Sequence, residues 1–195
     1  MEKLDTDALN LVFTQARTHS AFLPRPVTDA IVHELYDLVK FAPTSANCCP
    51  MRVVFVRSPE AKARLKPYLS AGNVEKTMQA PVTAIIGYDM NFAEKLPKLF
   101  PHVDARPWFA GAEDVVRTVA LRNSSIQAGF FIAAARSLGL DTGPMSGFDE
   151  AGVNAEFFAG TSVKANFLVN LGYGDPKHLF PRLPRLDFDE ACTLI

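Results

Sequence analysis

The stretch from Ala112 to Leu140 constrains the fold more than any other part of this sequence. It contains no proline, and its only internal glycine is Gly129. Gly139 stands near its end, where a glycine commonly terminates a helix. Apolar residues recur along it at helical spacing, namely Val115, Val119, Ile126, Phe130 and Ala133. The pattern predicts one helix that is much longer than the average of about 11–12 residues.

The composition of this predicted helix indicates that it is covered on most sides. Small residues dominate its second half and let another backbone approach closely, while its middle is polar: Asn123, Ser124, Ser125 and Gln127. A buried polar middle must find hydrogen-bond partners. Either the rest of the chain or a second copy could supply the cover, and a central core helix is the simpler interpretation. We expect three cations of the helix to reach solvent: Arg117, Arg122 and Arg136.

The composition as a whole predicts a single domain over residues 1–195. Hydrophobic residues make up 48% and charged residues 21%, which is typical of a folded chain rather than a disordered one. The length is sufficient for a real core. The net charge of −1 gives no electrostatic reason to expect nucleic acid or an acidic membrane surface as a partner. No window approaches 18 uninterrupted apolar residues, so we expect no membrane-spanning helix.

The cysteines indicate a reducing compartment. Cys48 and Cys49 are adjacent and Cys192 is distant, which fits neither a disulfide framework nor the spacing of a zinc site. The first ten residues are charged from the second position and lack the apolar core of a signal peptide. We therefore expect a cytoplasmic protein.

The rest of the chain alternates between helical and strand patterns. Capping residues and apolar periodicity predict four further helices, over 5–17, 28–42, 58–69 and 149–158. Runs of β-branched and aromatic residues predict three strands, over 52–57, 81–88 and 165–171. Prolines and turn residues predict irregular structure over 42–50, 91–109, 141–148 and 175–186. This alternation predicts an α/β or α+β domain with helices packed on a small sheet.

Several common kinds of active site find no support in this sequence. Cys49 could be a reactive thiol beside a cation or a helix start, although an ordinary buried thiol is the simpler interpretation. The four histidines are scattered, with no pair at the spacing of a helical metal site, so we expect no metal. There is no G-x-S-x-G, no P-loop and no G-x-G-x-x-G between a strand and a helix.

Four loops at the edges of predicted elements have an unusual polar composition: Arg17–Ser20, Thr44–Asn47, Pro144–Gly147 and Arg182–Arg185. Taken singly, each has an ordinary explanation as a solvated helix end, a turn, a loop before a cap or a basic tail. Taken together, they could meet the needs of a phosphorylated heterocycle that undergoes redox chemistry. A phosphate needs several fixed donors, which four side chains could supply: Arg17, His19, Arg182 and Arg185.

The other two loops could serve the flat ring of such a molecule. Asn47 offers an amide to the polar edge of a heterocycle, which needs both donors and acceptors. A glycine-containing turn such as Ser146-Gly147 can present a backbone donor near a reactive ring nitrogen.

The order of these loops resembles the FMN-dependent nitroreductase family. The motifs that carry the resemblance are R-T-H at 17–19, P-V at 26–27, A-P-T-S-A-N-x-x-P at 42–50, G-L-x-x-G-P-M-S-G-F-D at 139–149 and L-G-Y-G at 171–174. The T-S-A-N and P-M-S-G-F-D segments are the specific parts, and the resemblance extends from about residue 9 to residue 186. The most similar branch is the malonic semialdehyde reductase branch of pyrimidine degradation.

The resemblance implies the α+β nitroreductase fold, with a small central sheet flanked by helices. It also implies a homodimer in which the long central helices pack together and FMN lies at the interface, touched by both chains. By the same resemblance, the cofactor-binding residues fall into three groups. The phosphate and ribityl end would be held by Arg17, His19, Arg182 and Arg185, and the ribityl chain and ring edge by Ser45 and Asn47. The backbone around Ser146 and Gly147 would face the flavin N5.

Four positions depart from the pattern of the family. The family commonly has a second basic residue in its first motif, where this chain has Ala21. It commonly has Gln and Trp where Cys49 and Met51 stand, and many members have Glu in place of Ser146. A backbone donor would survive the change at Ser146, whereas a side-chain role would not.

The activity implied by the resemblance is that of an NAD(P)H-dependent flavin oxidoreductase. NADH or NADPH would reduce the flavin, and a small-molecule acceptor would then take the same place, so no catalytic side chain is required. The branch implies an acid aldehyde such as malonic semialdehyde, with Arg106 orienting its carboxylate, although a solvated loop arginine is the simpler interpretation of Arg106. A general nitro- or quinone reductase, a flavin-binding protein without turnover, and a dimeric interaction protein without flavin remain alternatives.

Overall fold

Four antiparallel strands form the centre of the fold in the computed structural model, which describes residues 3–195. The strands are β1 (Met51–Val56), β2 (Val82–Asp89), β3 (Asp141–Met145) and β4 (Val163–Gly172), and their spatial order is β1-β2-β4-β3. Every neighbouring pair runs antiparallel, with Val54 opposite Ile85 and Ala84 opposite Val169. An antiparallel sheet with helices packed against it is an α+β arrangement, which confirms the predicted fold class.

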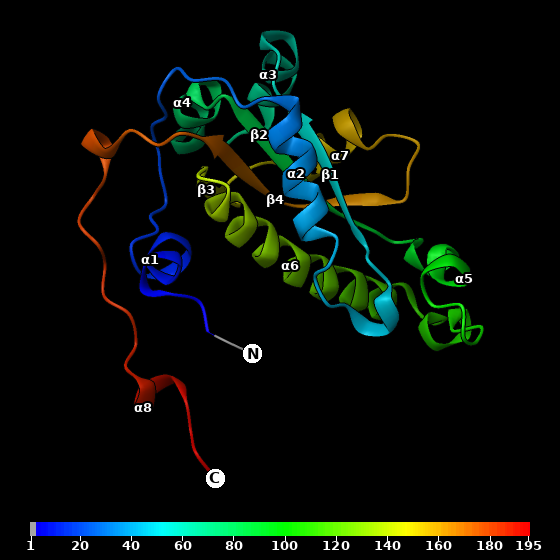
Figure 1. The fold of residues 1–195 in the computed structure, drawn as a ribbon. Helices are drawn as coiled ribbons and strands as arrows, with labels where there is room; N and C mark the ends of the chain where they lie inside the picture. The colour runs from blue at the N-terminus through cyan, green and yellow to red at the C-terminus, as the bar shows by residue number, and fades with distance from the viewer. Residues whose placement is uncertain (1–2) are drawn as a thin grey trace.

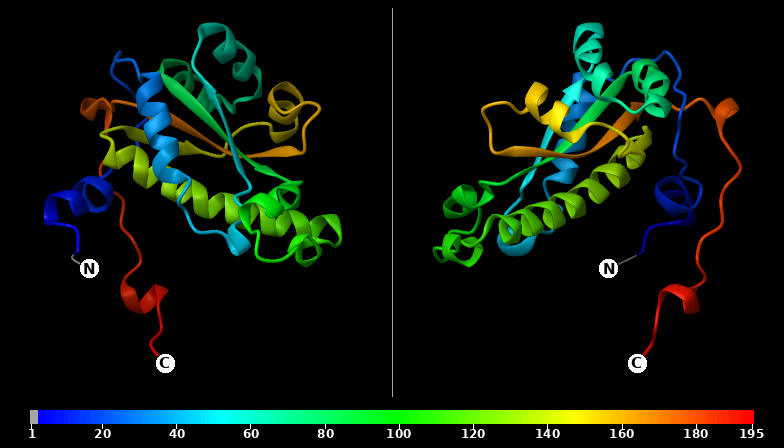
Figure 2. Two further views of the ribbon diagram at one scale, coloured as in Figure 1. Left: turned by 45° about the vertical axis from the view of Figure 1, so that its right-hand side comes forward. Right: turned by 180° about the vertical axis from the view of Figure 1, so that it is seen from behind.

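Helices cover both faces of this sheet (Figures 1 and 2). One face packs against α2 (Asp29–Val39) and α6 (Glu113–Ser137), and the other packs against α3 (Pro59–Leu65), α4 (Ala71–Gln79) and α7 (Glu150–Phe157). Side chains of successive residues of β2 point alternately to the two faces of the sheet. Ala84 and Ile86 join the core under α6, while Ile85 joins the core under α7, and all three are fully buried. Burial on both faces explains why this strand is almost continuously apolar.

The predicted long helix is confirmed as α6, which has 25 residues and ends before Gly139, a residue with a φ of 75°. Asn123, Ser124 and Gln127 of its polar middle are buried and bonded to backbone groups of the rest of the chain, while Ser125 is exposed. The three bonds are Ser45 N–H to Asn123 Oδ1 (2.9 Å), Ser124 Oγ to the Gly87 carbonyl (3.0 Å) and Met51 N–H to Gln127 Oε1 (2.9 Å). The helix therefore fixes both the start of the sheet and the loop before it.

The described N-terminal segment and the C-terminal tail extend on the same side of the molecule, away from the sheet (Figure 1). The first helix is shorter than predicted, because α1 (Thr6–Leu9) passes into one π-helical turn over Asn10–Thr14. The tail is extended, as predicted, between a 3-10 turn at Pro176–His178 and the short helix α8 (Phe188–Ala191). These segments carry large apolar side chains that the protomer leaves exposed: Leu11, Phe13, Phe180, Leu183, Leu186 and Phe188.

The predicted strands 52–57, 81–88 and 165–171 are confirmed as β1, β2 and β4, with ends that differ by one or two residues. The segment 91–109 is irregular, as predicted, and contains α5 (Leu96–Leu99) between two 3-10 turns. Helix α2 ends three residues earlier than predicted. Asp149 precedes α7 as predicted, but its side chain makes no capping hydrogen bond.

Two predictions of secondary structure were wrong. Residues 141–148 were expected to be a loop, but Asp141–Met145 form β3, which lies at the edge of the sheet. Pro144 is tolerated there because an edge strand can spare one backbone N–H. Helix α4 was not predicted at all, because its nine residues include few apolar ones.

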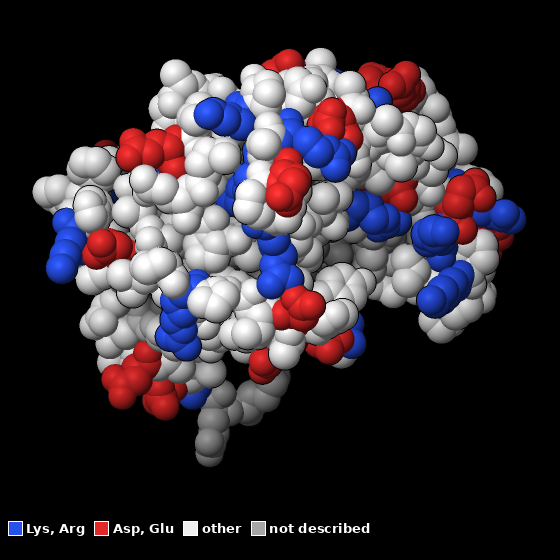
Figure 3. All heavy atoms as spheres, turned by 90° about the horizontal axis from the view of Figure 1, so that it is seen from above, with Lys and Arg blue, Asp and Glu red and all other residues white. Residues whose placement is uncertain are grey.

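The surface carries charges of both signs. On the face shown in Figure 3, basic and acidic side chains alternate and neither sign forms a continuous field. This agrees with the near-zero net charge of the sequence. Within residues 3–195, we find no helix with the length and apolar character needed to span a membrane.

Replacing Gln127 with Leu should destabilise the protein by about 1–3 kcal/mol, because the Met51 N–H would lose its acceptor in a buried place. Urea unfolding at fixed protein concentration measures the change. Ser137→Ala, at the exposed end of the same helix, is the control and should change stability by less than about 0.5 kcal/mol. A Gln127→Leu variant as stable as the control would contradict the proposed role of the polar middle.

Candidate functional site

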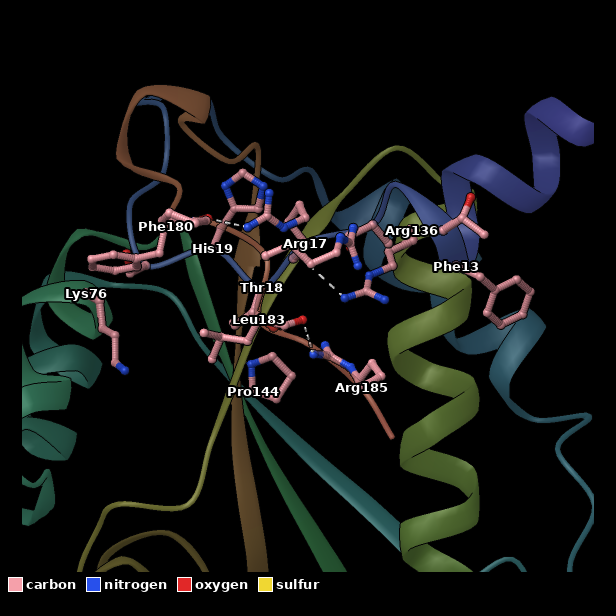
Figure 4. A pocket seen from close by; sticks show the side chains of 16 residues that line it. Phe13, Arg17, Thr18, His19, Lys76, Arg136, Pro144, Phe180, Leu183 and Arg185 are labelled. Carbon is pink, nitrogen blue, oxygen red and sulfur yellow. Dashed lines mark hydrogen bonds between the residues drawn. The ribbon is translucent and has the colours of Figure 1, made fainter. Parts of the chain in front are cut away.

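A cavity of about 1000 Å³ lies where the N-terminal loop, the chain tail, α4, β3 and the end of α6 meet. Five permanent cations line it: Arg17, Lys76, Arg136, Arg182 and Arg185. No Asp or Glu is found among the described residues that line it. Figure 4 shows Arg17, Lys76 and Arg185 around the cavity, each on a different segment. The structure thus brings all four predicted phosphate donors, Arg17, His19, Arg182 and Arg185, to one place.

The arginines of this cavity bond to backbone carbonyls rather than to carboxylates. Arg17 Nη2 donates to the Phe180 carbonyl, and Arg182 Nη2 donates to the Ala16 carbonyl at 3.0 Å, so each end of the chain holds the other. Arg185 Nη1 donates to two carbonyls of its own segment at 3.0 Å. Carbonyl partners leave the positive charges uncompensated, which favours an anion in the cavity.

Arg136 was expected to reach solvent, and this was wrong. The loop after α1 folds over the end of α6, so the Arg136 side chain is largely covered, and its Nη atoms lie 3.5 Å from the Val12 and Arg17 carbonyls. Burial lowers the pKa of its guanidinium. Its Nε atom is buried and has no partner among the described residues. Helical periodicity alone could not reveal a loop that covers this face.

His19 is buried and is held from three sides. Its backbone N–H donates to the Thr142 carbonyl at 3.0 Å, and its Nε2 lies 3.4 Å from Asp141 Oδ1. Its ring lies so close to Gly174 that a Cβ there would come within 2.0 Å of His19 Nδ1, so only glycine fits at this position of the L-G-Y-G motif. Burial is the main reason that the pKa of His19 lies below its ordinary value, and the imidazole is therefore neutral at pH 7.

Ser45 and Asn47 lie on a 3-10 turn at the far end of the molecule from this cavity. Three residues in this region have positive φ, namely Ala46 (47°), Asn47 (51°) and Cys49 (40°). Such conformations are costly for residues other than glycine and are often found at functional sites. The Asn47 amide donates to the Leu99 carbonyl at 2.8 Å, and its Oδ1 accepts from Cys49 Sγ at 3.3 Å.

Ser146 and Gly147 lie on the turn between β3 and α7, next to α4. The Gly147 carbonyl accepts hydrogen bonds from Asn73 Nδ2 at 2.7 Å and from the Ser70 N–H at 3.1 Å. A Cβ at Gly147 would lie 2.6 Å from Asn73 Nδ2, so a side chain would push this turn away from α4. The sequence prediction missed two residues of this region, Asn73 and Lys76, because it missed the helix that carries them. The only available signal was Ser70 before a run of helix-forming residues.

The two halves of the predicted site lie far apart in one chain. Ser45 is bonded to Asn123 in the middle of α6, whereas the cationic cavity includes Arg136 near its end. At about 1.5 Å per residue, the two points on the helix are roughly 20 Å apart. Between them, α6 exposes a strip that includes Ile126 and Phe130, which are 41% and 47% exposed.

Residues 14–173 match the model of the nitroreductase family. The chain belongs to the nitroreductase family. A relative from Burkholderia lata is 63% identical over all of both chains, and a second one from Stenotrophomonas maltophilia strain K279a is 62% identical over 98% of this chain and 97% of its own. Both carry the provisional name NADH dehydrogenase/NAD(P)H nitroreductase.

Solved structures of nitroreductases have the same fold as this chain. A provisionally named nitroreductase of Bacillus subtilis matches with a TM-score of 0.88 at 21% identity, over 98% of this chain and 100% of the other. One from Exiguobacterium sibiricum, solved in complex with FMN, matches with a TM-score of 0.85 at 17% identity over the whole of both chains. These likenesses confirm the predicted nitroreductase-like fold.

Proposed function

We propose that this nitroreductase-family protein is an NAD(P)H-dependent oxidoreductase that holds FMN in the cationic cavity and reduces a small-molecule acceptor. The enzyme class and the cofactor agree with the family to which the chain belongs and with the names of its relatives. Bound FMN would supply the redox chemistry, hydride transfer through N5 between NADH or NADPH and the acceptor. The protein supplies binding, orientation and charge.

The observation that carries this proposal is a cavity lined by five cations without a carboxylate among its described residues. A phosphate group fits this donor set, because arginine forks and oxyanions form strong hydrogen bonds. The buried Nε of Arg136 lacks a partner in the described part of the chain, and Arg17 and Arg182 bond to carbonyls rather than to carboxylates. Arg17, Arg182 and Arg185 would hold the phosphate, while the fixed backbone of His19 would shape the wall beside it.

Lys76 could supply the positive charge that is missing at Ala21. Its side chain extends from α4 toward the cavity (Figure 4). It would place a cation beside the flavin ring, where the family commonly uses the second basic residue of its first motif. The Ser146-Gly147 turn, held by Asn73, would present its backbone to the flavin N5.

A second copy of the chain would complete the site. Ser45 and Asn47 cannot reach a molecule seated near Arg136 in their own protomer, because roughly 20 Å separates the two regions along α6. An antiparallel pair of α6 helices would bring the Ser45–Asn47 turn of one copy toward the cationic cavity of the other. The exposed strip of α6 and the exposed apolar ends of the chain fit such a homodimer.

For the electron acceptor, we propose a small acid aldehyde. An acid aldehyde such as malonic semialdehyde would need a cation for its carboxylate, and Arg106 is our candidate. In this structure Arg106 already pairs with Asp104 through two hydrogen bonds of 2.8 Å. This paired state favours a general nitro- or quinone reductase as the second candidate, because neither acceptor needs that cation. The cytoplasmic location remains a prediction that rests on the three unpaired cysteines.

Arg17→Ala and Arg185→Ala should each weaken FMN binding by about 1.5–3 kcal/mol, or roughly 10- to 150-fold, because a charged hydrogen bond to phosphate is lost. Riboflavin, which lacks the phosphate, should bind as tightly to the variants as to wild type. Flavin fluorescence titration measures both affinities. Arg25→Ala, whose guanidinium lies over the Tyr173 ring, is the matched control. Wild-type FMN affinity in both cavity variants would show that the phosphate lies elsewhere.

Gly129→Leu should convert the dimer to a monomer and reduce FMN occupancy. Nothing in the protomer lies within 4 Å of a Cβ built at Gly129, so the folded chain itself tolerates the change. We prefer Gly129 to Ala134, because Ala134 packs against the core of its own protomer. Light scattering with flavin quantification gives the result, and Ser137→Leu on the same helix is the control. A wild-type monomer with full FMN occupancy would refute the shared site.

Arg106→Ala should lower kcat/KM for malonic semialdehyde more than for a quinone or a nitroaromatic compound, if Arg106 binds the carboxylate. Asp104→Asn should have the opposite effect on the aldehyde, because it removes the carboxylate that now occupies Arg106. Steady-state kinetics with the three acceptors test both variants. Equal losses for all acceptors in Arg106→Ala would argue against this role, and an inactive wild type with the aldehyde alone would favour the general reductase.

A further inference from the structure

A buried lysine outside the cavity has no role in the site described above. Lys62, on α3, is only 3% exposed. Its Nζ donates three hydrogen bonds, to the Thr77 carbonyl at 2.6 Å, the Ala80 carbonyl at 2.8 Å and Thr83 Oγ1 at 2.9 Å. All three acceptors are uncharged, and no carboxylate pairs with this ammonium group in the described part of the chain.

The hydrogen bonds continue from Lys62 into the sheet. Thr83 Oγ1, on β2, donates to Asn170 Oδ1 at 2.7 Å, and Asn170 Nδ2, on β4, donates to the Lys76 carbonyl at 3.2 Å. Thr83 and Asn170 are both fully buried. Three carbonyls at the C-terminal end of α4 are therefore held by one network, those of Lys76, Thr77 and Ala80. The Lys76 carbonyl also accepts the Ala80 N–H at 3.2 Å, whereas the Thr77 and Ala80 carbonyls, like the last carbonyls of other helices, depend on a partner outside the helix, which Lys62 supplies.

Such a network is costly to keep in a protein interior. Removal of the Lys62 ammonium from water disfavours its charged form, and burial lowers the pKa of this group to about 8. A cation at the C-terminal end of a helix is favoured by the negative end of the helix dipole, which offsets part of the cost. An apolar side chain at position 62 would fill the same space without that cost but could not donate to the Thr77 and Ala80 carbonyls. The network therefore fixes the position of the helix end, and its contribution to stability is not its only effect.

The position that it fixes is that of α4. This helix has only nine residues, and it carries both Asn73, which holds the Gly147 carbonyl at 2.7 Å, and Lys76, which lines the cationic cavity. Asn170 bonds to the backbone of Lys76 itself. A shift of α4 along its axis would therefore move Lys76 at the cavity and Asn73 at the Gly147 turn together.

We propose that Lys62, Thr83 and Asn170 are positioning residues that set α4 for flavin binding, by anchoring its C-terminal carbonyls beneath Lys76. The inference rests on the proposed function, because it assigns Lys76 and the Ser146-Gly147 turn to the flavin ring. It makes a distinct claim about which part of the cofactor is affected. The arginines act on the phosphate, whereas this network acts on the ring through α4.

Lys62→Met should weaken binding of FMN and riboflavin equally, by about tenfold, because both molecules carry the flavin ring beside which we place Lys76. Arg17→Ala should weaken binding of FMN alone. Fluorescence titration with the two flavins separates the cases, and Lys66→Met, an exposed lysine after the same helix, is the matched control. Thr83→Val, which keeps the side-chain shape, repeats the test if Lys62→Met fails to fold.

Two further readouts distinguish positioning from general stability. Hydrogen exchange should speed up in residues 71–79 of Lys62→Met but not in α6, with or without flavin. In a Lys76→Ala background, Lys62→Met should cause little further loss of flavin affinity, because it acts through Lys76. Undiminished flavin affinity, unchanged exchange in α4, or a full additional loss in the double variant would overturn the inference. A wild type that binds no flavin would instead refute the proposed function, while the exchange result would still decide whether the network anchors α4.

Discussion

The hydrogen bonds from the middle of α6 to the backbone of the sheet and the Ser45 loop are the constraint on which the rest of the structure depends. Asn123 and Gln127 each accept a backbone N–H from the segment that leads into β1. Both side chains are buried, so the loss of either bond would leave a polar group without a partner. The strained turn at Ala46 and Asn47 is thereby held at one fixed place along the helix.

The same helix connects this turn to the cationic cavity at its other end. Arg136 contacts the Arg17 carbonyl of the N-terminal loop. Hydrogen bonds from the Arg17 and Arg182 side chains join that loop to the C-terminal tail. Because a regular helix has a fixed rise per residue, α6 sets the distance between the two halves of the proposed flavin site at roughly 20 Å. Under the proposed function, a second copy packed against the exposed strip of α6 would bridge that separation.

The sequence predicted those parts of the structure whose signal is local. The polar middle and small second half of α6 indicated a covered helix, and the basic loops indicated an anion site that the structure assembles around Arg17, Arg182 and Arg185. It missed α4 with Lys76, because that helix is weakly apolar and depends on the buried network around Lys62. It also misplaced Arg136 in solvent. In both cases the decisive contacts join segments distant in the chain, which periodicity cannot reveal.

The central claim is that this fold holds FMN and passes reducing equivalents from a nicotinamide to an acceptor. The most direct test is to load the purified protein with FMN, remove the excess, release and quantify the bound cofactor, and follow the visible flavin absorbance after anaerobic addition of NADH or NADPH. We predict non-covalent FMN in stoichiometric amount with the chain, and rapid loss of the absorbance with at least one of the two nicotinamides. A protein that retains no flavin, or whose bound flavin neither nicotinamide reduces, would contradict the account.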